Sequence, residues 1–141
     1  MRIAVIGAGK MGVWFAKFFQ SKGYVVVLAD RKKEKLAKLK DLHVELTDNF
    51  KTAVQDADQI LLCVSISAVE EVVKAISPAV HEGQVVMDIC SIKEAPVKIM
   101  HQYIKGATVL GTHPVFGPGS NGVKHKAYVL TPTNSKEQEF A

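Results

Sequence analysis

Residues 2 to 12 read RIAVIGAGKMG, and the expected architecture of the whole 141-residue chain follows from them. The first five residues are mostly β-branched or apolar, as in a buried strand, and glycines then follow with the spacing GxGxxG. A strand that leads directly into this spacing and then into a helix is typical of a dinucleotide-binding turn. We expect the whole turn to contact the dinucleotide: Gly7, Ala8, Gly9, Lys10, Met11 and Gly12.

The remainder of the chain repeats this strand and helix pattern. Apolar runs without polar interruption alternate with helical patterns about a dozen residues long, which predicts parallel strands covered by helices on both sides. We therefore predict an α/β fold, a Rossmann-type doubly wound, mostly parallel sheet with helices on both faces. The expected strands are residues 2–6, 25–29, 43–47 (the weakest), 59–64, 84–89, 107–111 and 127–131.

Spacings of three and four place apolar side chains on single faces of two predicted helices, namely Met11, Phe15, Phe18 and Phe19, and Val69, Val72, Val73 and Ile76. Gly23 is expected to end the first helix, and Ser67 with Glu70 has the spacing of a capping box for the second. After the last strand, residues 131 to 141 predict a turn and the beginning of a further helix. We expect the chain to be one domain, residues 1–141, of a longer protein.

The charge and cysteine content exclude several classes of function. Residues 31–40 hold six of the 18 Lys and Arg and one of the 14 acidic residues, so the net charge of +4 arises from one segment. This distribution, with no aromatic stacking platform, argues against nucleic-acid binding. No apolar run is long enough for a membrane span, and no signal peptide is recognisable. Cys63 and Cys90 lack metal-ligand spacing, so we expect reduced thiols, no metal and a cytoplasmic location.

Asp30 ends the second predicted strand, 23 residues after Gly7. A carboxylate at this place can accept hydrogen bonds from both ribose hydroxyls of an adenosine, which favours NAD. Arg31 and the lysines after it could instead hold a 2′-phosphate, so NADP stays possible. We favour NAD and place Asp30 and Arg31 among the cofactor-binding residues.

Ligands of a doubly wound sheet bind beyond the carboxyl ends of its strands. We therefore expect Cys63, Val64 and Ser65, at the carboxyl end of the fourth strand, to contact the cofactor. Ser91 follows the fifth strand, and Pro96 indicates that the next helix begins at 93 to 95, which leaves the Ser91 hydroxyl free. His113 lies in GTHPVFGPGSNG (111–122), which we expect to be a loop. Histidine is a side chain suited to act as a catalytic base near neutral pH.

Taken together, GAGKMG, Asp30-Arg31, CVSISAVEEVV, DICSIKEAPV and GTHPVFGPG resemble the nucleotide-binding half of the prephenate dehydrogenase family, which includes arogenate dehydrogenases. The resemblance implies oxidative decarboxylation of prephenate to 4-hydroxyphenylpyruvate in tyrosine biosynthesis. It also implies that His113 takes the proton of the substrate hydroxyl and that Ser91 orients the histidine and the substrate. The family's helical C-terminal domain, which contributes to the substrate site and forms most of the homodimer interface, is absent from these 141 residues.

Three other interpretations remain open. The substrate could be arogenate, because the missing residues would distinguish it from prephenate. The GxGxMG pattern is also shared by β-hydroxyacid dehydrogenases and imine reductases. A non-catalytic nucleotide sensor would have the same glycine turn.

Overall fold

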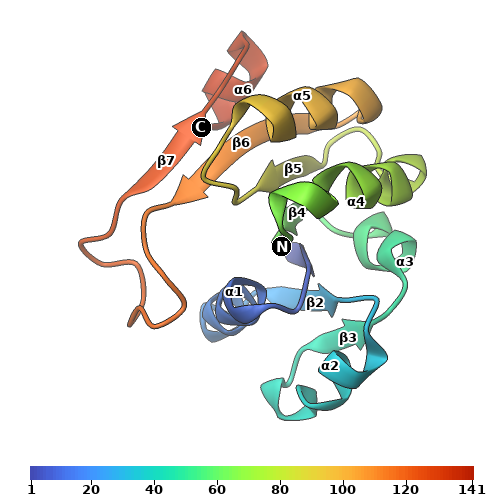
Figure 1. Ribbon diagram of the computed structural model, residues 1–141, viewed down its shortest axis with the longest axis vertical. Coiled ribbons are helices and arrows are strands. Elements are labelled where there is room, and N and C mark those ends of the chain that lie inside the picture. The colour runs from blue at the N-terminus through green and yellow to red at the C-terminus, as the bar shows by residue number, and fades with distance from the viewer.

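The computed structural model describes all 141 residues and contains one seven-stranded sheet (Figure 1). Its strands are β1 (Arg2–Ile6), β2 (Val25–Ala29), β3 (Glu45–Thr47), β4 (Gln59–Leu62), β5 (Val85–Asp88), β6 (Thr108–Pro114) and β7 (Tyr128–Thr131). The spatial order is β3-β2-β1-β4-β5-β6-β7, and every neighbouring pair is parallel except β6 with β7. The predicted doubly wound, mostly parallel sheet is therefore confirmed.

Helices cover both faces of the sheet. On one face α1 (Lys10–Ser21) and α2 (Lys33–Ala37) pack against β1 and β2, where Phe15 and Leu36 meet Val5 and Leu28. On the other face lie α3 (Phe50–Gln55), α4 (Val69–Ile76) and α5 (Glu94–Tyr103). The whole predicted apolar stripe of α4 is buried there, from Val69 to Ile76. Strands covered in this way must be apolar on both sides, which explains their unbroken Val, Ile and Leu runs.

The end of the sheet differs from expectation at β6. This strand continues through Thr112 and His113 to Pro114, although the Gly and Pro content predicted a loop from residue 111. The reason is pairing with the antiparallel strand β7, which places His113 opposite Val129 and Pro114 opposite Tyr128. The true loop therefore spans only residues 115–127. A non-local partner has overridden the local composition.

β7 is an edge strand and is less covered than its apolar sequence predicted. Its side chains are 38% exposed at Tyr128, 46% at Val129 and 38% at Leu130. β7 has β6 as its only neighbouring strand, and these residues remain partly open to solvent.

The helix ends combine predicted and unpredicted contacts. Gly23 has φ +83° and ends α1 in a Schellman arrangement, with its N–H bonded to Gln20 and that of Tyr24 to Phe19. The prediction that Ser67 caps α4 is wrong, because the 3-10 turn Ile66–Ala68 leads into α4 and the Ser67 hydroxyl bonds that of Ser65 instead.

None of the helices is long and apolar enough to cross a bilayer.

The predicted last helix is present as α6 (Ser135–Phe140) and is anchored to α5. Asn134 caps it by accepting the Glu137 N–H at 3.0 Å. The Glu137 carboxylate is only 2% exposed and lies 2.9 Å from Nε2 of His101 on α5. His101 is partly exposed, and its partner Glu137 is buried.

Candidate functional site

The glycine turn after β1 is shaped by close contacts at two of its three glycines. Gly7 has φ +109°, and a Cβ there would lie 2.4 Å from the Cys63 carbonyl oxygen. A Cβ on Gly12 would lie 1.8 Å from the Gly7 oxygen. Both positions therefore need glycine for packing within the chain. Gly9 differs, because a Cβ there would meet no atom within 4 Å.

This turn has the form of a phosphate cradle. Gly9 is the N-cap of α1 and offers no side-chain acceptor to the first N–H groups of the helix. The free N–H groups and the helix dipole attract an anion, and the missing side chain of Gly9 leaves room for it. The first turn of α1 contains no acidic residue and begins with Lys10. The residues present therefore fit the pyrophosphate of a dinucleotide.

An open cavity of about 520 Å³ adjoins the cradle, between α1 and the loop 115–127. Trp14 holds this loop in place, since its indole Nε1 donates to the Ser120 carbonyl at 2.8 Å and its ring lies 5.0 Å from that of Phe116. The cavity is lined by Ala8, Gly9, Lys10, Val13, Trp14, Lys17, Pro118 and Gly119.

Lysines gather around this cavity from separate parts of the sequence. Lys10 and Lys17 line it, while Lys124 and Lys126 line an adjacent hollow that shares Gly119 with it. The sum of charges along the chain had located the basicity in residues 31–40 alone. Folding brings these four further lysines together, which a count along the sequence does not detect.

Asp30 lies directly after β2 and is tied to the glycine turn. Its Oδ2 accepts the Ala8 N–H at 2.8 Å, its Oδ1 accepts the Lys32 N–H at 2.9 Å, and its side chain is 12% exposed. The Lys35 ammonium lies 3.7 Å from Oδ2. The carboxylate therefore stands at the edge of the turn, where the sequence placed it.

The neighbouring Arg31 is occupied by contacts within the chain. Its guanidinium pairs with Glu71 of α4 and lies over the Phe50 ring, 5.4 Å from the ring centre. Both charged side chains of the pair are largely exposed. The pair joins the end of β2 to α4.

The residues after β4 have divided roles. Cys63 is buried beneath the glycine turn and its N–H donates to the Ile6 carbonyl at 2.7 Å. Burial, together with nearby Cys90, raises the pKa of its thiol above the usual range. Val64 is partly buried, and Ser65 is exposed with its hydroxyl 3.1 Å from that of Ser67. Met11, in the first turn of α1, is partly buried and packs against the core.

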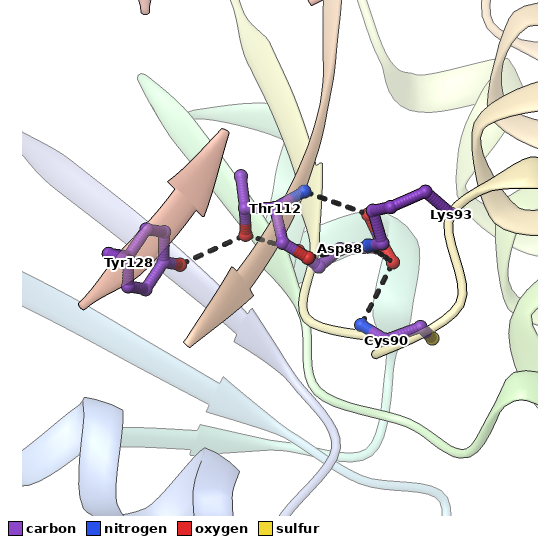
Figure 2. A network of polar contacts seen from close by, with 5 residues as sticks. All are labelled: Asp88, Cys90, Lys93, Thr112 and Tyr128. Carbon is purple, nitrogen blue, oxygen red and sulfur yellow. Dashed lines mark hydrogen bonds and ion pairs between the residues drawn. The ribbon is translucent and has the colours of Figure 1, made fainter. Parts of the chain in front are cut away.

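A buried polar network joins the ends of β5 and β6 (Figure 2). Asp88 is fully buried and pairs with the Lys93 ammonium, which also donates to the Thr112 carbonyl. The Asp88 carboxylate accepts the N–H of Thr112 at 3.2 Å and that of Cys90 at 2.9 Å. The Thr112 hydroxyl donates to the Asp88 backbone oxygen and lies 3.0 Å from the Tyr128 hydroxyl.

The sequence did not predict this network, although Asp88, Lys93 and Thr112 all lie at or just after the ends of predicted strands. The available signal was the buried strand that ends in an aspartate, with a lysine five residues later. An isolated aspartate within an apolar run must find a cation or several donors, because a buried charge without a partner is costly.

Ser91 and His113 are neighbours in sequence of residues in this network: Ser91 lies between Cys90 and Lys93, and His113 follows Thr112. α5 begins at Glu94, within the range expected, and the Ser91 hydroxyl caps nothing and is exposed. Side chains alternate along β6, so His113 lies on the same face as Gly111, whose absent Cβ would meet Val97 and Lys93. His113 thus faces the α5 side, where the 90–93 segment enters.

His113 is partly buried, and its Nδ1 is buried without a hydrogen-bond partner. No hydrogen bond joins Ser91 to His113 in this conformation. Buried polar atoms in folded proteins normally have a hydrogen-bond partner. An unpartnered imidazole nitrogen near the carboxyl end of β6 therefore indicates a partner that is supplied by a bound ligand or by the rotation of a side chain. No group of three or more His, Cys, Asp or Glu that could hold a metal ion is present.

Comparison with known proteins agrees with this geometry. Residues 15–141 match the family model for the prephenate dehydrogenase nucleotide-binding domain. A protein of Methanocaldococcus jannaschii named "Probable arogenate/prephenate dehydrogenase" is 39% identical over 136 residues, which is 94% of this chain and 30% of that protein.

Two solved structures share the fold of this chain. Prephenate dehydrogenase from Aquifex aeolicus, in complex with hydroxyphenyl propionate and NAD+, is 25% identical with a TM-score of 0.81, over 99% of this chain and 54% of that one. An imine reductase from Streptomyces aurantiacus also has a TM-score of 0.81, over 99% of this chain and 50% of that one, but at 21% identity it shows a shared fold only.

The chain spans about a third of the M. jannaschii relative and about half of these solved structures. The family match covers nearly its whole length, including β4, the 88–93 segment and β6. We conclude that the chain belongs to the prephenate dehydrogenase family, whose nucleotide-binding domain is matched by residues 15–141.

Proposed function

We propose that residues 1–141 form the dinucleotide-binding domain of an enzyme that oxidatively decarboxylates prephenate to 4-hydroxyphenylpyruvate. The observation that carries this proposal is the position of His113. It stands at the carboxyl end of β6, at the sheet edge that also holds the glycine turn and Asp30, and its Nδ1 has no partner. A base at this edge and a phosphate cradle at the same edge are the two parts that such a reaction requires.

When bound, the nicotinamide would supply the hydride acceptor. The role of His113 is to accept the proton of the substrate hydroxyl, which becomes more acidic as hydride leaves the same carbon. A neutral imidazole has one nitrogen free to accept this proton. We assign the orienting contact to Nδ1, which the exposed Ser91 hydroxyl could supply after rotating, and proton acceptance to Nε2. Loss of the substrate carboxylate as CO2 then gives the aromatic product.

NAD is the proposed cofactor. Asp30 places a carboxylate at the turn, where it would accept hydrogen bonds from ribose hydroxyls and repel a 2′-phosphate. Arg31, the first basic side chain after it, is already paired with Glu71 and lies over Phe50. The 2′-phosphate of NADP would have to compete with Glu71 for this guanidinium. The bound NAD+ of the A. aeolicus relative is consistent with this choice.

The remaining parts of the active enzyme would come from beyond these residues. We propose that a helical C-terminal domain completes the substrate site and forms a homodimer. Its residues would distinguish prephenate from arogenate, since the two substrates differ only in the side chain that carries a keto or an amino group.

The test is an assay of the full-length enzyme with prephenate and with arogenate, each with NAD and with NADP. We expect NADH formation to be fastest with prephenate. His113→Asn should lower kcat by about 100-fold or more, because general-base catalysis contributes about 10² to 10⁴. A rate near wild type in His113→Asn would remove the catalytic assignment. Faster turnover of arogenate would correct the substrate, and nucleotide binding without any turnover would favour a sensor.

A further inference from the structure

The pair formed by Asp88 and Lys93 has no role in the mechanism described above, yet it is the most deeply buried charged group at the site. Asp88 is fully buried and the Lys93 side chain is 16% exposed. Removing two charges from water is costly, and apolar residues of similar size would serve stability as well or better. The contacts of the pair are therefore informative.

These contacts converge on Thr112, the residue before His113. Lys93 donates to the Thr112 carbonyl, and Asp88 accepts the Thr112 N–H at 3.2 Å. The Thr112 hydroxyl donates back to the Asp88 carbonyl oxygen. The carbonyl held by Lys93 belongs to the planar peptide bond that joins Thr112 to His113, so the ammonium restrains the backbone from which the imidazole projects.

The same pair restrains the segment that carries Ser91. The Asp88 carboxylate accepts the Cys90 N–H at 2.9 Å, directly before Ser91, and pairs with the Lys93 side chain, two residues after it. Figure 2 shows Cys90 and Lys93 on one side of the Asp88 carboxylate and Thr112 on the other. Ser91 is thus enclosed by two contacts to one carboxylate.

Gly111 provides the space through which Lys93 reaches β6. A Cβ at this position would lie 3.4 Å from Cδ of Lys93 and 2.5 Å from Cγ2 of Val97. An added Cβ would clash with Val97 of α5, the helix that follows Lys93, and would touch the lysine stem at an ordinary contact distance. The absence of a side chain at 111 is therefore part of the same arrangement.

We propose that Lys93 is a positioning residue, which acts with Asp88 to fix the backbones of His113 and Ser91 relative to each other for the reaction. The inference rests on the proposed function, because it concerns the geometry of the same two groups. Misplacement of a reacting group by about 1 Å can cost about 100-fold in rate. The expected effect of losing Lys93 is therefore on kcat and not on nucleotide affinity.

The experiment compares variants of the full-length enzyme with prephenate and NAD. Lys93→Met keeps the stem and removes the ammonium, and we expect kcat to fall about 10- to 100-fold while the Kd for NAD stays within about twofold. The matched control is Lys105→Met, since Lys105 also donates to a backbone carbonyl, that of His101 at 2.8 Å, but on the surface. Its kcat should be unchanged.

A double variant separates positioning from simple stability. Lys93→Met leaves the Asp88 charge buried alone and should lower the Tm, whereas Asp88→Asn with Lys93→Met removes both charges and should recover the Tm. The Thr112 carbonyl is still without its donor in the double variant, so kcat should stay low. Recovery of kcat together with Tm would show a structural role only and overturn the proposal.

The two proposals fail in different ways. If His113→Asn retains the wild-type rate, the proposed base is wrong whatever Lys93 does. If His113→Asn is inactive while Lys93→Met is folded and has a kcat within twofold of wild type, the base stands and the positioning role of Lys93 is wrong.

Discussion

The carboxylate of Asp30 accepts the backbone N–H of Ala8 at 2.8 Å, so the end of β2 and the glycine turn after β1 are directly joined. The carboxylate satisfies a buried donor within the turn. In the proposed function it would also accept hydrogen bonds from the adenosine ribose of the dinucleotide.

Asp30→Ala should accordingly affect both binding and stability. We expect the Kd for NAD to rise about tenfold or more, because hydrogen bonds to a charged group contribute about 1.5–3 kcal/mol. The Kd for NADP should change less, since a like charge is removed from near the 2′-phosphate. Titration with both nucleotides measures the difference. Equal losses for the two would show that Asp30 does not contact the ribose.

The same substitution leaves the Ala8 N–H without its acceptor, which should lower the free energy of unfolding by about 1–3 kcal/mol. Urea denaturation measures this cost. Asp41→Ala is a suitable control, because Asp41 is exposed and makes no side-chain hydrogen bond or ion pair. It should leave both stability and nucleotide binding unchanged.

Two glycines of the same turn should respond differently to alanine. In Gly12→Ala the new methyl group would overlap the Gly7 carbonyl oxygen, so we expect a loss of about 1–3 kcal/mol or more in the free energy of unfolding. In Gly9→Ala nothing lies within 4 Å of the new atom and φ is −76°, so stability should change by about 1 kcal/mol at most.

Nucleotide binding should show the opposite pattern for Gly9. The methyl group of Gly9→Ala would occupy the space left for the pyrophosphate, and we expect at least a tenfold rise in the Kd for NAD. Wild-type affinity in this variant would mean that the phosphates do not approach the turn at Gly9.

The two thiols should be unreactive in the native protein. Burial, with a further contribution from Asp88, raises the pKa of Cys90 to about 11, and burial raises that of Cys63 further. At pH 8 about one Cys90 thiol in a thousand would be ionised. A disulfide reagent such as DTNB should therefore modify neither cysteine within minutes until urea is added, after which both should react. Fast native labelling of Cys90 would contradict this.

His81 gives a defined pH dependence of stability. Its Nδ1 lies 2.9 Å from the Glu82 carbonyl and its Nε2 lies 3.0 Å from that of Gln55, so only the doubly protonated ring donates to both. These bonds raise the pKa of His81 above its ordinary value of 6.5. Its contribution is therefore complete below the unfolded-state pKa and is lost as pH rises through the folded-state pKa.

The measurement is the difference in unfolding free energy between wild type and His81→Gln across the range from pH 5 to 8.5. We expect the difference to be largest at the acidic end and to diminish as pH rises. NMR titration of the His81 ring should give a pKa above 6.5. If the difference in unfolding free energy grew as the pH rises, the pKa of His81 would not be raised in the folded protein.

The sequence allowed the positions of most strands and the glycine turn to be predicted, because both depend on local patterns. Unbroken apolar runs identified β1, β2, β4 and β5, and Pro96 correctly placed the start of α5. The entry to α4 was predicted wrongly, since a 3-10 turn satisfies the backbone where a Ser67 cap was expected.

The contacts that depend on distant pairing could not be predicted in this way. The extension of β6 to His113 requires β7, which is joined to it only after the loop 115–127. The role of Lys93 depends on a glycine at 111 and a carbonyl at 112, about twenty residues away along the chain. Local composition does not show which distant strands pair or which distant residues come into contact.

Trp14 is the only tryptophan in the chain, and it lines the cavity beside Gly9 and Lys10. Its indole is hydrogen-bonded to Ser120 and stacked on Phe18, so it has a fixed orientation. The chain therefore carries a built-in optical probe at the phosphate cradle. Its emission overlaps the absorption of a reduced nicotinamide. Energy transfer from this single indole would therefore report binding of the reduced dinucleotide at the proposed site without any added label.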